Sequence, residues 1–92
     1  MPERKSKKDT KIRIEDKEYF LHKIIWEDIV GDSTIQSTEE FLKMRTAKIT
    51  TIAYIFKKDK NYLYTFASYS QDGCFGDRNI IPLGVVKKIA QI

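Results

Sequence analysis

Two runs of β-branched and aromatic residues, joined by a short polar segment, limit what this chain can fold into more than any other feature. The runs cover residues 47–56 (AKITTIAYIF) and 62–70 (YLYTFASYS), and residues 57–61 (KKDKN) lie between them. Such residues are enriched in strands, and loops of this length commonly join hairpin strands, so the pattern predicts a long antiparallel hairpin. Side chains alternate between faces along a strand. One face of the second strand is expected to carry Tyr62, Tyr64, Phe66, Ser68 and Ser70.

Shorter patterns on both sides of this hairpin predict further strands. Residues 19–30 (YFLHKIIWEDIV) have strand composition, and they follow an alternating segment at residues 12–14 and a turn at residues 15–17. Residues 80–82 (IIP) predict a short strand that ends at the proline, and residues 85–92 (VVKKIAQI) predict a closing strand. Along the closing strand, alternation puts Val86, Ala90 and Ile92 on one face and Val85 and Ile89 on the other.

One helix is predicted between residues 30 and 47. Ser37 and Glu40 have the spacing of a capping box, in which a hydroxyl covers a free amide and a carboxylate three residues later reaches back. Phe41, Leu42 and Met44 supply apolar surface for about two turns. We therefore expect a short helix that plugs or covers the sheet.

These elements define the expected fold class. A chain of 92 residues with 41% hydrophobic content can bury one small core. The prediction is a mainly β fold: a small, strongly bent antiparallel sheet or barrel of the SH3-like or Sm-like type, with five or six strands and one short helix. Residues 1–11 are expected to form a basic flexible arm, and residues 12–92 a single β domain. The lysines of the closing strand either protect a sheet edge or leave it to pair with a second subunit, so a homo-oligomer is expected.

The positive charge of the chain is concentrated at its N-terminus. Residues 1–13 hold six basic and two acidic residues, which accounts for the whole formal charge of +4, and the remaining residues carry 11 of each sign. The arm is either a contact for nucleic acid or another acidic partner, or a solvated tail. Its candidate contact residues are Arg4, Lys5, Lys7 and Lys8.

The inventory of reactive residues argues against several classes of protein. The single cysteine, Cys74, excludes an intramolecular disulfide and a cysteine-based zinc cluster, and the single histidine, His22, excludes a multi-histidine metal site. No known catalytic motif is present, so we expect no enzyme, no metal and no cofactor. The chain also lacks an apolar leader and a long apolar segment, which predicts a cytoplasmic protein with no membrane contact.

A glycine-containing loop at residues 71–79 (QDGCFGDRN) is the best candidate for ligand contact. Its glycines would let a ligand approach the backbone, and the planar guanidinium of Arg78 suits phosphate or carboxylate. The alternative is that the glycines only turn the chain, that Phe75 covers one end of the barrel, and that Arg78 pairs with Asp77 or Asp72.

Other aromatic and cationic residues extend this candidate site. Trp26 is either a stacking surface or a core anchor, and Arg45 is either a phosphate contact or a helix-end residue. The complete candidate ligand-binding set is Trp26, Arg45, Lys48, Tyr69, Phe75 and Arg78.

Five ordered segments resemble a group of small tailed-phage proteins that share a W-x-D strand, a short helix, a hairpin and an I-P ending. The segments are residues 25–29 (IWEDI), 38–41 (TEEF), 49–54 (ITTIAY), 67–70 (ASYS) and 80–89 (IIPLGVVKKI). The resemblance implies an intracellular phage product, dispensable for the virion, with an SH3-like or Sm-like sheet. It further implies action by binding, either to a host protein or, as an oligomer, to the nucleotide messengers of bacterial immunity.

Two functional hypotheses follow. The first is a non-enzymatic homo-oligomer that sequesters a small anionic, nucleotide-like ligand, in keeping with a counter-defence role. The second is an inhibitor of a host protein, or an Sm-like RNA-binding protein, that uses the basic arm or a strand edge. Balanced charge outside the arm favours a small ligand over a long duplex, which requires many phosphate contacts.

Overall fold

The computed structural model describes residues 10–92 and contains mostly β-strands. The helical elements are α1 (Thr38–Phe41) and a 3₁₀ turn at Leu83–Val85. The strands are β1 (Lys11–Ile14), β2 (Lys17–Asp28), β3 (Ala47–Lys58), β4 (Tyr62–Phe66), β5 (Ser68–Tyr69), β6 (Phe75–Gly76), β7 (Asn79–Pro82) and β8 (Val86–Gln91).

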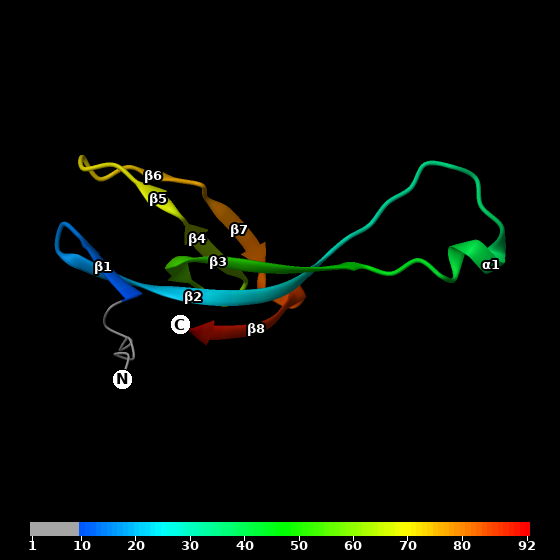
Figure 1. Ribbon diagram of the computed structural model, residues 1–92, viewed down its shortest axis with the longest axis horizontal. Helices are drawn as coiled ribbons and strands as arrows, with labels where there is room; N and C mark the ends of the chain where they lie inside the picture. Colours follow the sequence, from blue (N-terminus) through cyan, green and yellow to red (C-terminus); the bar gives the residue numbers. More distant parts are fainter. Residues whose placement is uncertain (1–9) are drawn as a thin grey trace, which may run out of the picture.

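Six strands form one antiparallel sheet (Figure 1). Its order is β1-β2-β3-β4-β7, and β8 returns to pair with β2. Thr10 Oγ1 donates to the carbonyl of Ile92 at 3.0 Å, so the start of β1 meets the end of β8. The predicted mainly β, bent antiparallel sheet with one short helix is confirmed. Within residues 10–92 the sheet stays open, so the closed barrel that was the other expectation is not formed.

The predicted hairpin is present as β3 and β4, and it contributes to two hydrophobic clusters. In β2, Tyr19 and Ile24 belong to different clusters and are five positions apart, which places them on opposite faces of the sheet. The aliphatic core contains buried Ile24, Leu63 and Ile81, flanked by Trp26, Ile55, Leu83, Val85, Val86 and Ile89. The aromatic core contains buried Ile14, Tyr19 and Phe66, flanked by Ile12, Tyr54 and Phe75.

The closing strand departs from strict alternation. Ile25 pairs with Lys88 while Trp26 pairs with Val86, so Lys87 is the extra residue of a β-bulge. The bulge brings Val86 and Ile89 to the same aliphatic core, although alternation predicted that they lie on opposite faces. Lys87 itself forms an ion pair with Glu27 at 2.9 Å.

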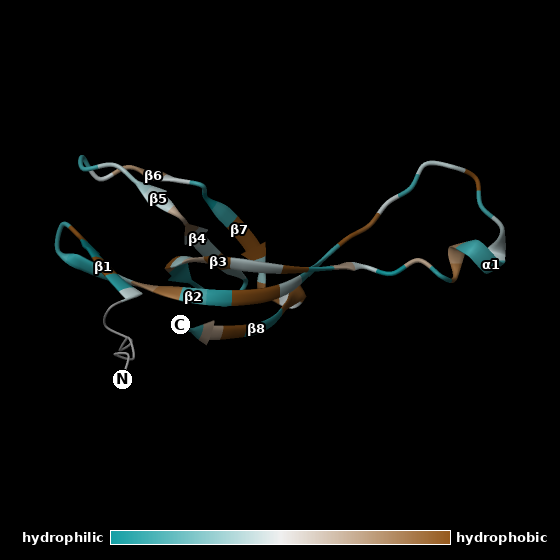
Figure 2. Cartoon of the chain, viewed as in Figure 1, coloured by the Kyte–Doolittle hydropathy of each residue, from teal (hydrophilic) through white to brown (hydrophobic). Residues whose placement is uncertain are grey.

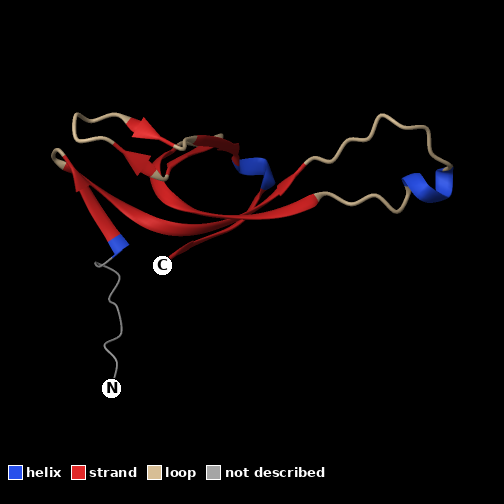
Figure 3. Cartoon of the chain, turned by 45° about the horizontal axis from the view of Figure 1, so that its top comes forward, coloured by secondary structure: helices blue, strands red, loops and turns tan. Residues whose placement is uncertain are grey.

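Residues 29–46, called the long loop below, connect β2 to β3 and extend well beyond the sheet (Figures 1 and 3). The predicted capping box of α1 is confirmed: Ser37 Oγ accepts from the Glu40 amide, and Glu40 Oε1 accepts from the Ser37 amide, both at 3.2 Å. The expectation that this helix covers the sheet is wrong. Phe41 and Leu42 are exposed because α1 lies at the tip of the loop, away from either core.

Candidate functional site

An open groove of about 680 Å³ lies over the aromatic side of the sheet. Strand β3 supplies one wall, β4 supplies the floor, and the segment from β6 to β7 supplies the other wall. We call it the aromatic groove. Its lining residues are Phe56, Tyr64, Thr65, Phe66, Phe75, Arg78, Asn79 and Ile80.

The phenylalanine rings of the groove support one another. The Phe75 ring centroid lies 4.8 Å from that of Phe66 and 5.0 Å from that of Phe56, and both pairs are close to edge-to-face. Such pairs contribute about 0.5–1.5 kcal/mol each beyond the area that they bury. Phe66 is fully buried, whereas Phe56 stays partly open to solvent. The groove therefore has a rigid base and an accessible aromatic surface.

Arg78 is the cation that lines this groove. The predicted alternative partners, Asp77 and Asp72, do not bind it, and its guanidinium forms no ion pair or hydrogen bond within residues 10–92. Asp72 instead accepts a hydrogen bond from Ser70 Oγ, which holds the pKa of Asp72 below its ordinary value. Arg78 is thus free to meet an anion.

Two lysines lie over aromatic rings at the margin of the groove. Lys57 Nζ is 5.7 Å from the ring centroid of Tyr64. Lys17 Nζ is 5.7 Å from the ring centroid of Phe56 and 5.6 Å from that of Tyr19. Cations at such distances are attracted to the ring faces. They also add positive charge beside the groove.

The two glycines of the neighbouring loop have local structural roles. Gly73 has a φ of 87°, which L-residues with a Cβ rarely adopt. A Cβ on Gly76 would lie 2.5 Å from Ser68 Oγ. Gly73 therefore allows the turn of the chain, and Gly76 allows β6 to approach β5 closely.

The structure brings only part of the predicted ligand set together. Phe75 and Arg78 line the groove, and Tyr69 of β5 is the register partner of Phe75 but lies outside the lining. Trp26 packs on the opposite face with the aliphatic core, where its Nε1 donates to Thr51 Oγ1 at 3.0 Å. Trp26 therefore lies where a core anchor would lie, which was one of the two roles expected for it.

Arg45 and Lys48 also lie away from the groove. Arg45 Nη1 donates to the carbonyls of Leu42 at 3.1 Å and Met44 at 2.8 Å, so it satisfies backbone groups just after α1. Lys48 stands opposite Glu27 in the pairing of β2 with β3. Neither side chain reaches the residues of the aromatic groove.

Sequence reasoning missed Phe56, Tyr64 and Asn79 as parts of this site. The shared face expected for Tyr64 and Phe66 was a usable signal, because an aromatic pair on one face often lines a binding surface. Phe56 carried no such signal. It lies where the β3–β4 register shifts between Ile55 and Lys57, and such an irregularity is not visible in the sequence pattern.

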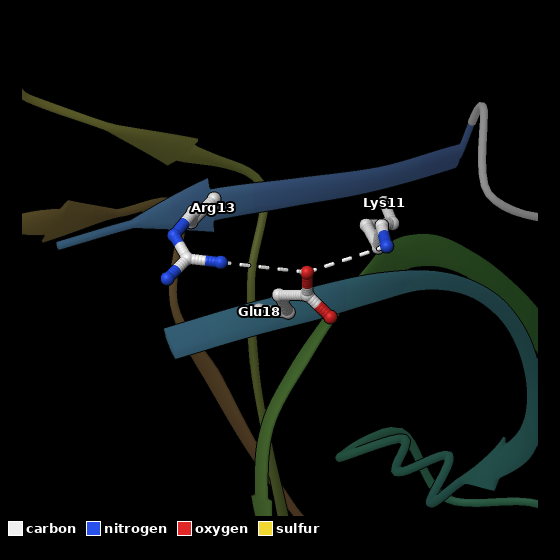
Figure 4. A network of polar contacts seen from close by, with 3 residues as sticks. All are labelled: Lys11, Arg13 and Glu18. Carbon is white, nitrogen blue, oxygen red and sulfur yellow. Dashed lines mark ion pairs between the residues drawn. The ribbon is translucent and has the colours of Figure 1, made fainter. Parts of the chain in front are cut away.

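The candidate contacts of the basic arm, Arg4, Lys5, Lys7 and Lys8, lie outside the described residues. Two nearby basic residues are in the first hairpin, where Lys11 Nζ and Arg13 Nη1 both approach Glu18 Oε2, at 3.3 and 3.6 Å (Figure 4). Their charge is therefore partly neutralised within the sheet. Neither contributes a free cation to the aromatic groove.

Comparison with family models, with curated proteins and with solved structures finds no match in any of the three. Among residues 10–92, no group of three histidine, cysteine, aspartate or glutamate side chains is placed to hold a metal ion. Over the same residues, neither helical segment has the length and apolar character needed to cross a membrane. The site must therefore be interpreted from its own geometry.

Proposed function

We propose that this protein is a non-enzymatic binding protein and that its aromatic groove takes a small anionic ligand with an aromatic base, of the nucleotide class. The observation that carries the proposal is the Arg78 guanidinium, which has no partner within residues 10–92 and lines a groove with accessible aromatic rings. Phosphate would bind Arg78, and the base would stack beside Phe75 or Phe56.

The size of the groove supports this class of ligand. Small-molecule sites typically have volumes of roughly 300–1,000 Å³, and they combine apolar walls with a few polar groups that orient the ligand. The groove has about 680 Å³, and Arg78 and Asn79 stand on one wall opposite Phe56. A ligand with one flat apolar part and one anionic part fits both walls at once.

On this proposal the groove binds its ligand and does not catalyse a reaction. His22, the histidine of the chain, is in β2, where its Nδ1 donates to the carbonyl of Phe20 at 2.8 Å, and it does not line the groove. A protein that holds a nucleotide messenger without converting it would serve the counter-defence role that the phage resemblance implies. The alternative of an RNA or host-protein partner draws on the basic arm, whose contact residues are outside the described part of the chain.

The proposal is tested by calorimetric titration of the full chain with mononucleotides and cyclic dinucleotides. Arg78→Ala should weaken binding by about 10- to 100-fold, which corresponds to the loss of a charge-assisted hydrogen bond. The melting temperature should not change, because Arg78 supports no other described residue. The matched control is Arg13→Ala, which removes an arginine from β1, outside the groove lining.

Three outcomes would contradict the proposal. One is the absence of heat of binding for every nucleotide tested with the unmodified chain. Another is equal affinity of Arg78→Ala and the unmodified chain, with both proteins folded. The third is a similar loss in Arg13→Ala, which would show that general positive charge, and not this groove, holds the ligand.

A further inference from the structure

The long loop holds a large share of the exposed apolar surface of this protein. Ile35 is 102% exposed, Leu42 is 71% exposed and Phe41 is 65% exposed, and Ile29 and Val30 are also open to solvent. Figure 2 shows these apolar stretches along the loop, separated from the sheet. Side chains of this size contribute favourable free energy when they are buried. A binding partner could recover that free energy.

The same loop forms a hollow of about 370 Å³. Val30 comes from the start of the loop, and Phe41, Leu42 and Met44 come from its second half, so the two sides of the loop together make an apolar concave surface. Exposed apolar patches bounded by polar residues are typical of protein interaction sites. Ile35 extends from the same loop and has the size and chemistry to enter such a hollow on another molecule.

Local hydrogen bonds hold the loop in this shape. Asp32 accepts from the Thr34 amide at 2.9 Å and from Thr34 Oγ1 at 2.7 Å, which also lowers the pKa of Asp32. The capping box orders the start of α1, and Arg45 satisfies carbonyls after its end. A segment that is already ordered loses less conformational entropy when it binds.

The order of charged residues around Phe41 and Leu42 indicates which partner binds this apolar surface. Glu39 and Glu40 precede Phe41 and Leu42, and Lys43 and Arg45 follow them. If two copies of this segment pair in antiparallel orientation about a two-fold axis, the acidic end of each copy faces the basic end of the other. The apolar centres then meet at the axis. This segment is self-complementary in the way that a two-fold interface requires.

We propose that the long loop is a homodimer interface in which two copies pair across their Glu39–Lys43 segments and each Ile35 enters the hollow of its partner. This places the expected homo-oligomer contact in the loop and not at the closing strand. The proposal does not depend on the ligand, because the loop and the aromatic groove have no residue in common.

The first test is the mass of the full chain in solution, measured by sedimentation velocity at micromolar concentration. The unmodified chain should sediment as a species whose mass is twice the 10.8 kDa of one chain. Leu42→Asp should raise the dimer dissociation constant by about 100-fold or more, because it would bury two carboxylates in the apolar centre of the interface. Ile52→Asp is the matched control, since Ile52 is an exposed isoleucine on β3, outside the loop. It should leave the dimer intact.

The second test uses charge reversal to determine the orientation of the two copies. Glu39→Lys and Lys43→Glu should each weaken the dimer, because each variant places like charges opposite one another in both halves of its own interface. Mixing the two variants should restore dimerisation, since position 39 of one copy then meets the opposite charge at position 43 of the other in both halves. Glu39 is preferable to Glu40 here, because Glu40 belongs to the capping box.

A monomeric unmodified chain would overturn the proposal, and so would an oligomer of the same mass in Leu42→Asp. Failure of the mixed charge variants to associate would exclude the antiparallel arrangement. A monomer that instead captures a different protein through the loop would assign this surface to a host partner. Titration of Leu42→Asp with nucleotides should give the same affinity as the unmodified chain. This measurement distinguishes failure of the dimer proposal from failure of the proposed nucleotide site in the groove.

Discussion

The sheet and the long loop both contain large apolar residues, but they reach opposite degrees of burial. Leu63 and Phe66 of β4 are almost completely buried, whereas Ile35 and Phe41 of the loop are mostly exposed. In the sheet, strand pairing brings segments distant in sequence together, so each side chain finds neighbours on other strands. In the loop, most hydrogen bonds join residues only a few positions apart. Local bonds can order a segment, but they cannot bury it.

The two regions also differ in the hydrogen bonding and solvent exposure of their polar groups. In the loop, side chains such as Asp32 and Ser37 bind the backbone around them and remain open to solvent. In the sheet, Thr65 is buried, and its Oγ1 has no hydrogen-bond partner within residues 10–92. Thr65 alternates with Tyr64 and Phe66, so its side chain points toward the aliphatic core, although Thr65 is also among the residues that line the groove. The sheet therefore includes one polar group that costs stability.

The largest predicted effect contrasts one phenylalanine from each region. Phe66→Ala should lower the free energy of unfolding by about 3–5 kcal/mol, because it opens a cavity in the aromatic core. Phe41→Ala should change it by less than about 0.5 kcal/mol, because the side chain is exposed in the single chain. Urea unfolding monitored by circular dichroism, at concentrations where the protein is monomeric, gives both values. If Phe66→Ala does not fold, Phe66→Leu should show a smaller loss in the same direction, and equal effects at the two positions would refute the contrast.

A second prediction concerns the unpartnered hydroxyl in the sheet. Thr65→Val keeps the shape of the side chain and removes Oγ1, so it should raise the free energy of unfolding by about 1 kcal/mol. Thr51→Val is an informative comparison, because Thr51 Oγ1 accepts a hydrogen bond from Trp26 and its removal should destabilise the protein. Chemical denaturation of both variants is the measurement. A loss of stability in Thr65→Val would show that the hydroxyl has a partner, for example an ordered water.

The smallest predicted effect lies where the sheet meets the loop. Glu27 accepts hydrogen bonds from Lys87 and from Thr46 Oγ1, and these bonds, together with the Lys87 charge, lower the pKa of Glu27 below its ordinary value of 4.5. A carboxyl whose pKa is lowered by folding stabilises the protein above its unfolded pKa, and this contribution is lost as the pH falls through the folded pKa.

The melting temperatures of the unmodified chain and of Glu27→Gln should therefore differ slightly near neutral pH. The difference should shrink as the pH falls below 4.5 and disappear once the pH is below the lowered pKa of Glu27 in the folded protein, where its carboxylate is protonated. High salt should also reduce it, because Lys87 is exposed and Glu27 is partly exposed to solvent. A difference that persists unchanged into acid would show that shape or hydrogen bonding at Glu27, and not its charge, supports the junction.

Much of the local structure was predictable because it depends on neighbouring residues. The hairpin of β3 and β4, the long strand β2, the strand ended by Pro82 and the capping box at Ser37 were all found from short patterns. The candidate site was predictable only in part. Phe75 and Arg78 occur in the same loop, so sequence proximity alone suggested a shared site. Phe56 joins them through a register shift, and Trp26 is separated from them by the thickness of the sheet.

The sequence by itself determined where the longer strands and the short helix form, how the helix begins, and which residue types are available for chemistry, but not the short strands β5 and β6. Turn geometry, capping and alternation act over a few residues, so they can be found in a linear pattern. Only the tertiary structure decided that β8 pairs with β2, that Lys87 forms a bulge, that α1 lies far from the sheet, and which side chains meet in the groove. Those outcomes depend on packing between segments that are distant in sequence, and no local pattern specifies which of the possible contacts has the lowest free energy.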